Sequence, residues 1–168
     1  MSTAWENWNF TDGVQDIVQR IKSVAQAPGS AWARIVATRD DIADITEEQQ
    51  VTPGVYVIYR GFSVVGKATT QQATLEHRFA VVLAVSVASP GKDVTARTQE
   101  AGRYLPSLLK ALHGYIPAGC TTPLVPASPP APWGKGKFSY YPLVFTSEAI
   151  YTTRNGPGNG PLPLDRRV

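Results

Sequence analysis

Apolar side chains recur at helical spacing near the beginning of the chain. Thr11 or Asp12 is placed to cap this segment, and Pro28-Gly29 is placed to stop it. The pattern therefore predicts a helix over residues 12–26. The apolar positions on its one face are Val14, Ile17, Val18, Ile21, Val24 and Ala25.

Three segments that follow have the composition of strands. Residues 34–38 and 54–60 are short and rich in β-branched and aromatic side chains, with a polar stretch between them. Residues 71–87 first alternate between polar and apolar and then become almost uniformly apolar. This change is typical of a strand that begins at an edge and runs into a sheet covered on both faces. We predict that 71–87 is the central strand, paired with 54–65 across a turn at Gly66-Lys67.

The second half predicts another helix and then a strand. Apolar positions share one helical face over 93–113, where Asp93 is placed as the N-cap. Pro106 lies inside this helix and predicts a kink or a break into two pieces, because proline lacks the backbone N–H. Residues 137–153 are aromatic and β-branched, which predicts a long closing strand with Pro142 at an edge or a bulge.

Glycine and proline mark off segments that do not follow these periodic patterns. Residues 117–136 contain proline at positions 117, 123, 126, 129, 130 and 132, so they cannot form a continuous ladder. We predict an ordered, irregular arm or an edge hairpin there. Residues 1–10 form a predicted N-terminal arm, and the Gly- and Pro-rich residues 154–168 form a predicted flexible C-terminal tail.

The order of these elements predicts an α+β fold. It has a mainly antiparallel sheet with two helices packed on one face, an extended Pro/Gly-rich arm and a C-terminal tail. A length of 168 residues suits a single core, which we place at residues 11–153.

Composition narrows the possible classes of protein. Charged residues make up 17% of the chain and the net charge is +3, which does not favour a dedicated nucleic-acid-binding protein. Cys120 is the single cysteine, so an intramolecular disulfide is excluded. The N-terminus lacks the features of a signal peptide, and the longest apolar run, 79–88, is about half of a membrane span. We expect a soluble cytosolic product with no membrane partner.

One motif resembles a phosphate-binding loop. Residues 61–67 have the required glycine and lysine spacing, but Ala68 stands where Ser or Thr should bind Mg²⁺, and a strand pattern follows instead of a helix. We interpret the motif as two strands joined by a Gly-Lys turn. Gly134-Lys135-Gly136-Lys137 is likewise interpreted as a flexible basic turn.

The chain offers few groups for catalysis or metal binding. His77 and His113 have no partner at the spacing of metal ligands, and Cys120 has no adjacent base. We therefore expect no enzymatic activity, no catalytic residue, no metal and no cofactor.

Two clusters can be interpreted in more than one way. The acidic segment 40–48 is either a solvated connection or a surface that faces a basic partner or a lumen; it contains Asp40, Asp41, Asp44, Glu47 and Glu48. The aromatic residues Trp5, Trp8, Phe10 and Trp133 lie in segments that cannot form a core of their own. They either cap the domain core or anchor a subunit interface.

The order of elements resembles that of the phage tail terminator family, which includes the lambda-type terminator and Mu-like tail-completion proteins. An amphipathic helix opens the chain, and an apolar strand at 79–87 follows. The segment 101–117, Ala-Gly-Arg-Tyr-Leu-Pro-Ser-Leu-Leu-Lys-Ala-Leu-His-Gly-Tyr-Ile-Pro, is similar to a Gly-x-Leu…Leu-x-Gly-Trp-x-Pro pattern. An aromatic strand at 138–145 closes the domain. Tyr115 in place of Trp, and Pro106 inside the helix, depart from the pattern.

The resemblance implies a structural protein of the virion tail. It implies a ring, in this family a homohexamer, at the head-proximal end of the tail tube, assembled in the host cytoplasm. There it would end tube polymerisation and contact the tail tube protein and a head–tail connector or neck protein. DNA would pass through the lumen without sequence-specific binding, beside the acidic residues of 40–48. Interface candidates, placed by composition, are Trp5, Trp8, Phe10, Trp133, Lys135, Lys137, Arg154, Arg166 and Arg167.

Other classes of protein stay open at this point. A head-completion or neck connector protein of the same virion would differ only in where it docks. A nucleotide-binding enzyme that uses Gly61–Lys67 and a host-directed regulatory module are the further alternatives. A regulatory module should be a monomer or dimer in solution. Ring formation therefore distinguishes it from a tail terminator and from a neck connector protein.

Overall fold

The computed structural model describes residues 9–41, 43, 46–86 and 94–152 and has the α+β fold that the sequence predicts. Two helices and six strands carry the fold, with a short 3-10 helix in the connection between the first two strands. In chain order the elements are α1 (Phe10–Ala25), β1 (Ile35–Thr38), η2 (Glu47–Gln49), β2 (Gly54–Val65), β3 (Gln72–Ser86), α2 (Val94–Leu112), β4 (Val125–Ala127), β5 (Trp133–Lys135) and β6 (Phe138–Thr152).

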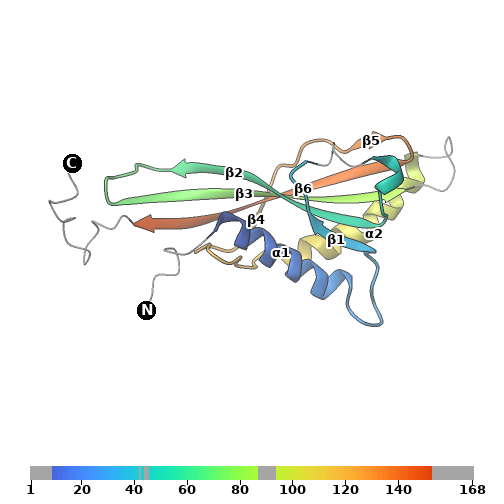
Figure 1. Cartoon of the computed structure of the whole chain (residues 1–168), viewed down its shortest axis with the longest axis horizontal. Helices are drawn as coiled ribbons and strands as arrows, with labels where there is room; N and C mark the ends of the chain where they lie inside the picture. The colour runs from blue at the N-terminus through green and yellow to red at the C-terminus, as the bar shows by residue number, and fades with distance from the viewer. Residues whose placement is uncertain (1–8, 42, 44–45, 87–93, 153–168) are drawn as a thin grey trace.

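One sheet organises the molecule. Its strand order is β1-β2-β3-β6-β4, with β5 also paired to β6, so β3 is the central strand as predicted. The pairs are antiparallel except β1–β2, which are parallel. Both helices lie on one face of the sheet and η2 lies on the other, while β5 is an edge strand beside β6 (Figure 1). The ends of β2, β3 and β6 run on past the helices as a long ribbon (Figure 1).

The first helix begins earlier than its periodicity suggests. Asn9 is the N-cap, and its side chain accepts a hydrogen bond from the Thr11 amide at 3.0 Å. The Asp12 carboxylate in turn accepts from the Asn9 amide at 3.1 Å, which completes a capping box. The prediction that Thr11 or Asp12 caps the helix is therefore wrong. Asn9 satisfies the free amides of the first turn, so Phe10 is already helical.

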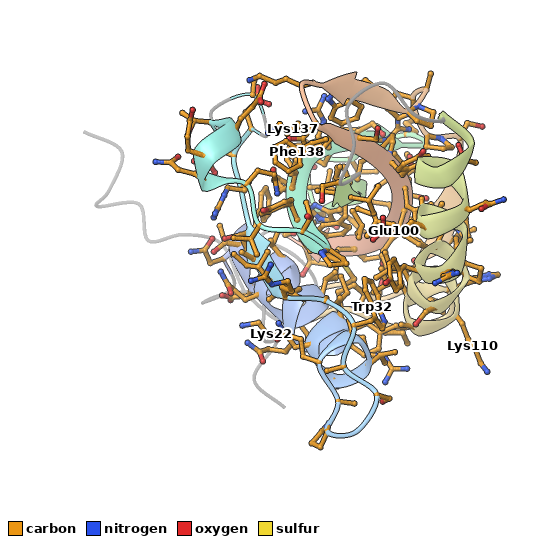
Figure 2. All side chains as sticks on the ribbon, turned by 90° about the vertical axis from the view of Figure 1, so that its right-hand side faces the viewer. Lys22, Trp32, Glu100, Lys110, Lys137 and Phe138 are labelled. Carbon is orange, nitrogen blue, oxygen red and sulfur yellow. The ribbon has the colours of Figure 1, made fainter. Side chains whose placement is uncertain are left out.

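The main core lies between the helices and the sheet. Phe79, Phe145 and Leu83 are fully buried beneath α1 and α2 and form its centre. Trp32 closes one end, where its ring stacks on Tyr104 with the centroids 4.4 Å apart; Figure 2 shows it between the two helices.

The second helix is continuous. Pro106 lies inside it with an exposed ring, so the predicted break into two pieces is wrong. Ala101 and Leu108, before and after the proline, are both buried in the same core. Because the same core holds both turns, packing outweighs the lost hydrogen bond. The helix ends at Leu112, one residue before the predicted bound, and Gly114, with φ 86°, follows its end.

The proline-rich arm runs along the outer side of β6 as two short edge strands, in agreement with the predicted edge hairpin. β4 pairs with Val144–Thr146 and β5 pairs with Phe138–Tyr140. Pro142 falls between these two pairings and keeps its register with Val82 of β3. Its missing N–H therefore falls where neither β4 nor β5 pairs with β6, and no bulge is needed.

Asp16 ties the beginning of the arm to α1. Its carboxylate accepts hydrogen bonds from the Tyr115 hydroxyl at 2.7 Å and from the Ala118 amide at 2.8 Å. Burial and the hydrogen bond to this carboxylate raise the pKa of Tyr115 to about 12, so the phenol stays protonated and keeps donating. The contact fixes where the arm leaves the helical layer.

Candidate functional site

The face of the sheet away from the helices carries a second, smaller apolar cluster. Tyr56, Ile58 and Val82 are buried there although α1 and α2 lie on the opposite face. Arg39 and Gln50 contact the Tyr56 side chain on one side, and the Trp133 indole stacks on Tyr140 on the other. This two-sided burial explains why β3 is almost uniformly apolar. We call this side of the sheet the open face.

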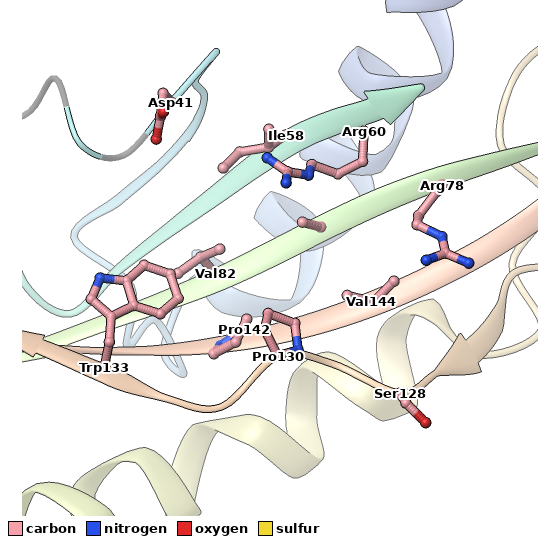
Figure 3. Close-up of a pocket in the computed structure, with 11 residues that line it drawn as sticks. Asp41, Ile58, Arg60, Arg78, Val82, Ser128, Pro130, Trp133, Pro142 and Val144 are labelled. Carbon is pink, nitrogen blue, oxygen red and sulfur yellow. The ribbon is translucent and has the colours of Figure 1, made fainter. Parts of the chain in front are cut away.

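A pocket of about 510 Å³ lies on the open face between these two groups of contacts. Its floor is apolar and comes from β2, β3 and β6 (Figure 3). The indole of Trp133 forms one wall and stacks on Tyr140 with the ring centroids 5.2 Å apart. The residues that line the pocket are Asp41, Ile58, Arg60, Arg78, Ala80, Val82, Ser128, Pro130, Trp133, Pro142 and Val144.

Two arginines give the pocket a positive end. Arg60 and Arg78 come from the neighbouring strands β2 and β3, and both are exposed pocket-lining residues (Figure 3). Within the part of the chain that the structure describes, neither guanidinium forms an ion pair. Arg60 stands in an irregularity of the β2–β3 register between Tyr59 and Phe62. Unpaired guanidinium groups over an apolar floor can hold a carboxylate or phosphate group.

Gln50, which follows the acidic segment 40–48, forms hydrogen bonds with two tyrosines of the open face. Its amide donates to the Tyr56 hydroxyl at 2.8 Å and to the Val51 carbonyl at 2.9 Å, and its carbonyl oxygen accepts from the Tyr140 hydroxyl at 3.1 Å. The side chain is buried, so each of these groups depends on the others for its partner. The sequence analysis missed Gln50 because a lone glutamine in a polar stretch carries no periodic signal.

Replacing Gln50 by leucine is expected to lower the free energy of unfolding by about 1–3 kcal/mol. The leucine keeps the volume but leaves two buried tyrosine hydroxyls without this partner. Urea unfolding followed by tryptophan fluorescence measures the change. The control is Gln49→Leu, at the neighbouring exposed position, for which we expect less than about 0.5 kcal/mol. Equal losses in the two variants would contradict the role given to Gln50.

The acidic segment runs beside the lysine-bearing turn of the same subunit. Asp40, Asp41, Glu47 and Glu48 are exposed. The Glu47 carboxylate lies against Gly136, where an added side chain would collide with it. Lys135 donates to the Ala43 carbonyl at 3.5 Å. These four carboxylates thus lie in solvent along one border of the open face.

A cluster of rings surrounds His77 on the helix side of the long ribbon. His77 is fully buried, and its Nδ1 lies 2.8 Å from the Tyr59 hydroxyl and its Nε2 3.4 Å from the Tyr151 hydroxyl. Phe10, from the first turn of α1, lies edge-on to His77 with the ring centroids 5.1 Å apart. Burial lowers the pKa of His77 from its usual 6.5. Burial also raises the pKa of Tyr59 and of Tyr151, so both phenols stay neutral.

The buried imidazole predicts how stability depends on pH. Since the native pKa of His77 lies below 6.5, the unfolded chain binds a proton near that pH while the folded chain does not. The free energy of unfolding is therefore expected to fall as pH drops below about 6.5. His77→Phe should flatten this part of the curve, measured by urea unfolding between pH 7.5 and about 5. His113→Gln, at an exposed histidine, is the control. An unchanged slope in His77→Phe would contradict the assignment.

The structure places only part of the predicted interface. Phe10 packs within its own subunit against Tyr59, Phe62, His77 and Tyr151. Trp133 lines the open-face pocket, Lys135 contacts the acidic segment, and Lys137 is exposed next to them. Five further interface candidates lie outside the described residues: Trp5, Trp8, Arg154, Arg166 and Arg167. Asp44, one of the predicted lumen residues, also lies outside them.

The geometry of residues 61–67 does not fit a nucleotide site. Gly61–Val65 end strand β2, and Gly66, with φ 68°, begins the connection to strand β3. A phosphate-binding loop needs a helix N-terminus after the lysine, and residues 66–86 continue into a strand instead. Among the described residues no three His, Cys, Asp or Glu side chains come together as metal ligands. None of the helices there is long and apolar enough to span a membrane.

Comparison with models of protein families shows which family the chain belongs to. The model of the phage tail terminator protein family matches residues 9–155, which includes every described helix and strand. The chain therefore belongs to the phage tail terminator family, a family of structural proteins of the virion tail. A search of curated proteins finds no match. The fold and the resemblance noted in the sequence thus lead to the same class of protein.

Proposed function

We propose that this chain forms a ring, of six copies, on the head-proximal end of a phage tail tube. There it ends tube polymerisation and joins the tail to the head or neck. The observation that carries the proposal is the family match, which spans the whole described domain. The proposed partners are further copies of the chain, the tail tube protein and a connector or neck protein. The proposed location is the virion tail after assembly in the host cytoplasm.

The shape of the subunit supports this role. A ring subunit needs two unlike surfaces, one for each neighbour, and further surfaces for the proteins above and below. The open face offers a pocket with two arginines that form no ion pair with any described residue, and the ribbon offers exposed apolar side chains beyond the helices. Low charge content, 17%, also fits a chain that buries surface on assembly.

The test uses the purified full-length chain. Light scattering gives its mass in solution, negative-stain imaging gives its shape, and addition to polymerising tail tube protein shows whether tube growth stops. We expect a ring of about six copies, in solution or on tube ends, and tubes that cease to lengthen. A stable monomer that leaves tube length unchanged would overturn the proposal. Rings that bind connector complexes but ignore tubes would favour a neck protein instead.

The acidic segment is proposed to line the lumen, where negative charge keeps passing DNA from adhering. Asp40→Asn with Asp41→Asn is expected to raise DNA retention by the rings several-fold at low salt, measured by filter binding. The matched control, Gln15→Lys with Gln19→Lys, makes the same change in net charge at exposed positions of α1. Equal DNA retention by the two double variants would contradict the proposal that the acidic segment lines the lumen.

A further inference from the structure

The pocket on the open face continues toward the ribbon. A second hollow of about 330 Å³ shares Arg60 and Arg78 with the first, and beyond these two arginines it is lined by Ser63 and Glu76. The two hollows together form one groove along the open face. We call it the open-face groove; the arginines lie in its middle, between the half beside Trp133 and the half beside Glu76.

Two carboxylates lie next to each other at the ribbon end of this groove. Glu76 of β3 pairs in register with Glu148 of β6, so the two side chains are on the same face of the sheet. Arg78 is two residues from Glu76 on the same strand and therefore shares that face. Among the described residues neither carboxylate forms an ion pair. Since like charges directly opposite each other repel, this end of the groove favours a cation.

The open-face groove thus carries three kinds of surface in a fixed order. The half beside Trp133 has an apolar floor, the two arginines come next, and the two carboxylates lie beyond them. Asp41 borders the apolar half, on the same side as Trp133 and away from Arg78 (Figure 3), so it repels an acidic group there. A complementary peptide has apolar residues first, then an acidic residue, and then basic residues.

Residues 161–167 of this chain have that order. Their sequence is Pro-Leu-Pro-Leu-Asp-Arg-Arg, and they follow the last described residue, Thr152, after a Gly-rich stretch. Alternating prolines favour the extended polyproline conformation, which rises about 3.1 Å per residue, close to the rise of about 3.3 Å in a strand. With Asp165 over the two arginines of the groove, the leucines therefore fall on the apolar floor and the basic residues fall beside the carboxylates.

The direction of the segment determines which copy supplies it. In this order it runs the same way as β6, which ends at Thr152 at the far end of the ribbon (Figure 1). Because Arg78 pairs with Thr146, the chain would have to return about 32 Å along β6 to place Pro161 in its own groove. Residues 153–160 reach at most about 32 Å when fully extended, so none remain for the reversals of direction. A segment bound in this direction therefore comes from another copy.

We propose that residues 161–167 of each copy lie in the open-face groove of the next copy in the ring. The leucines cover the apolar floor, the aspartate binds the two groove arginines, and Arg166 and Arg167 meet the two carboxylates. The inference rests on the proposed ring and adds a contact that holds neighbours together. Because each segment reaches forward to the next copy, the contact repeats in one sense, as a closed ring requires.

Disulfide trapping tests this docking in the full-length chain, in a Cys120→Ser background. Ser128→Cys places a thiol in the wall of the groove, and Leu164→Cys places one in the segment. The two single variants are mixed before assembly, so that a bond between these sites forms only between copies. We expect covalent dimers from the mixture, and a ladder up to the full ring from the double variant. A double variant that cross-links only within one copy would overturn the assignment to a neighbour.

Two controls make the trapping specific. Lys110→Cys, on the outside of α2 (Figure 2), replaces Ser128→Cys and should give no dimer with Leu164→Cys. Asp165→Arg with Arg167→Asp keeps the net charge of the segment and reverses the order of its charges, so the trapping yield should fall several-fold. An equal yield would contradict the charge order that aligns the segment.

Trapping also separates this inference from the proposed function. Leu162→Cys is trapped against Ser128→Cys as well, which covers the neighbouring register. Rings that form without a cross-link in either register would overturn the docking and leave the ring intact. The lack of any ring, in solution or on tubes, would overturn the proposed function and this inference together.

Charge reversal tests the same contact without cysteine. Arg60→Glu with Arg78→Glu should raise the protein concentration needed for ring formation about tenfold, with unchanged circular dichroism. Asp165→Lys added to this variant should recover part of the loss. The control, Arg103→Glu with Lys110→Glu, makes the same change in charge at exposed positions of α2 and should leave assembly unchanged. A combined variant no better than Arg60→Glu with Arg78→Glu would contradict the pairing of Asp165 with these arginines.

Discussion

Phe145→Ala is expected to lower the free energy of unfolding by about 3–5 kcal/mol. The ring is fully buried in β6 and pairs in register with Phe79 of β3, beneath both helices. Removing it takes away its burial energy and leaves a cavity that the rigid sheet can only partly fill. Domains of this size are stable by about 5–15 kcal/mol, so the loss is a large share of the total.

Urea unfolding of the monomeric protein at low concentration measures this effect. Phe62→Ala is the matched control, because Phe62 is 51% exposed on the ribbon; we expect less than about 1 kcal/mol there. Ring assembly adds a second readout. Phe145→Ala should reduce assembly only through the unfolded fraction, because the buried Phe145 ring cannot contact a neighbouring copy. A loss in Phe145→Ala no larger than the control would contradict its place at the centre of the core.

Gly54→Val is expected to be nearly as damaging, with a loss of about 3 kcal/mol. Gly54 is buried where β1 and β2 begin, and a Cβ atom there would lie 2.6 Å from the Val51 carbonyl oxygen and 3.0 Å from Ile35 Cγ2. The first of these atoms is backbone, so the strand entry must move to make room. The expected result is loss of the β1–β2 pairing as well as of stability.

Gly102→Ala is the control for this prediction. Gly102 lies in α2 with no atom within 4 Å of an added Cβ. Alanine should stabilise the helix by about 0.5–1 kcal/mol, because it restricts the unfolded chain more than glycine does. Thermal unfolding of both variants should therefore give shifts of opposite sign. Stabilisation by Gly54→Val would contradict the close packing of Gly54 against the Val51 carbonyl at the beginning of β2.

The order of elements could be predicted because the strands and helices differ in their burial. β3 is apolar on both sides because helices cover one face while Gln50 and Trp133 lie over the other, and this pattern allowed β3 to be predicted as the central strand. Pro142 could be assigned to an edge because its missing N–H allows few other positions. The family resemblance rested on the same patterns, so it identified a fold more securely than a surface.

The parts that could not be predicted depend on contacts between distant residues. Arg60 and Arg78 meet on the open face through the β2–β3 register, which includes a local shift at Tyr59/Phe62. Gln50 finds Tyr140 ninety positions away. Pro106 stays helical because the core holds both sides of it. In each case the contact that determines the local structure is made by a residue far away in the sequence. The local pattern of apolar and polar residues therefore cannot predict it.

The central strand also has a consequence for how the chain is made. β2 and β3 are neighbours in sequence, and such a hairpin forms within about 1–10 μs. β6, the second partner of β3, is synthesised only after α2 and the arm. At about 5–20 residues per second, the ribosome leaves the apolar edge of β3 without its partner for several seconds. A nascent chain can therefore capture a strand from another copy before its own β6 emerges, so domain-swapped dimers are the expected by-product of rapid expression.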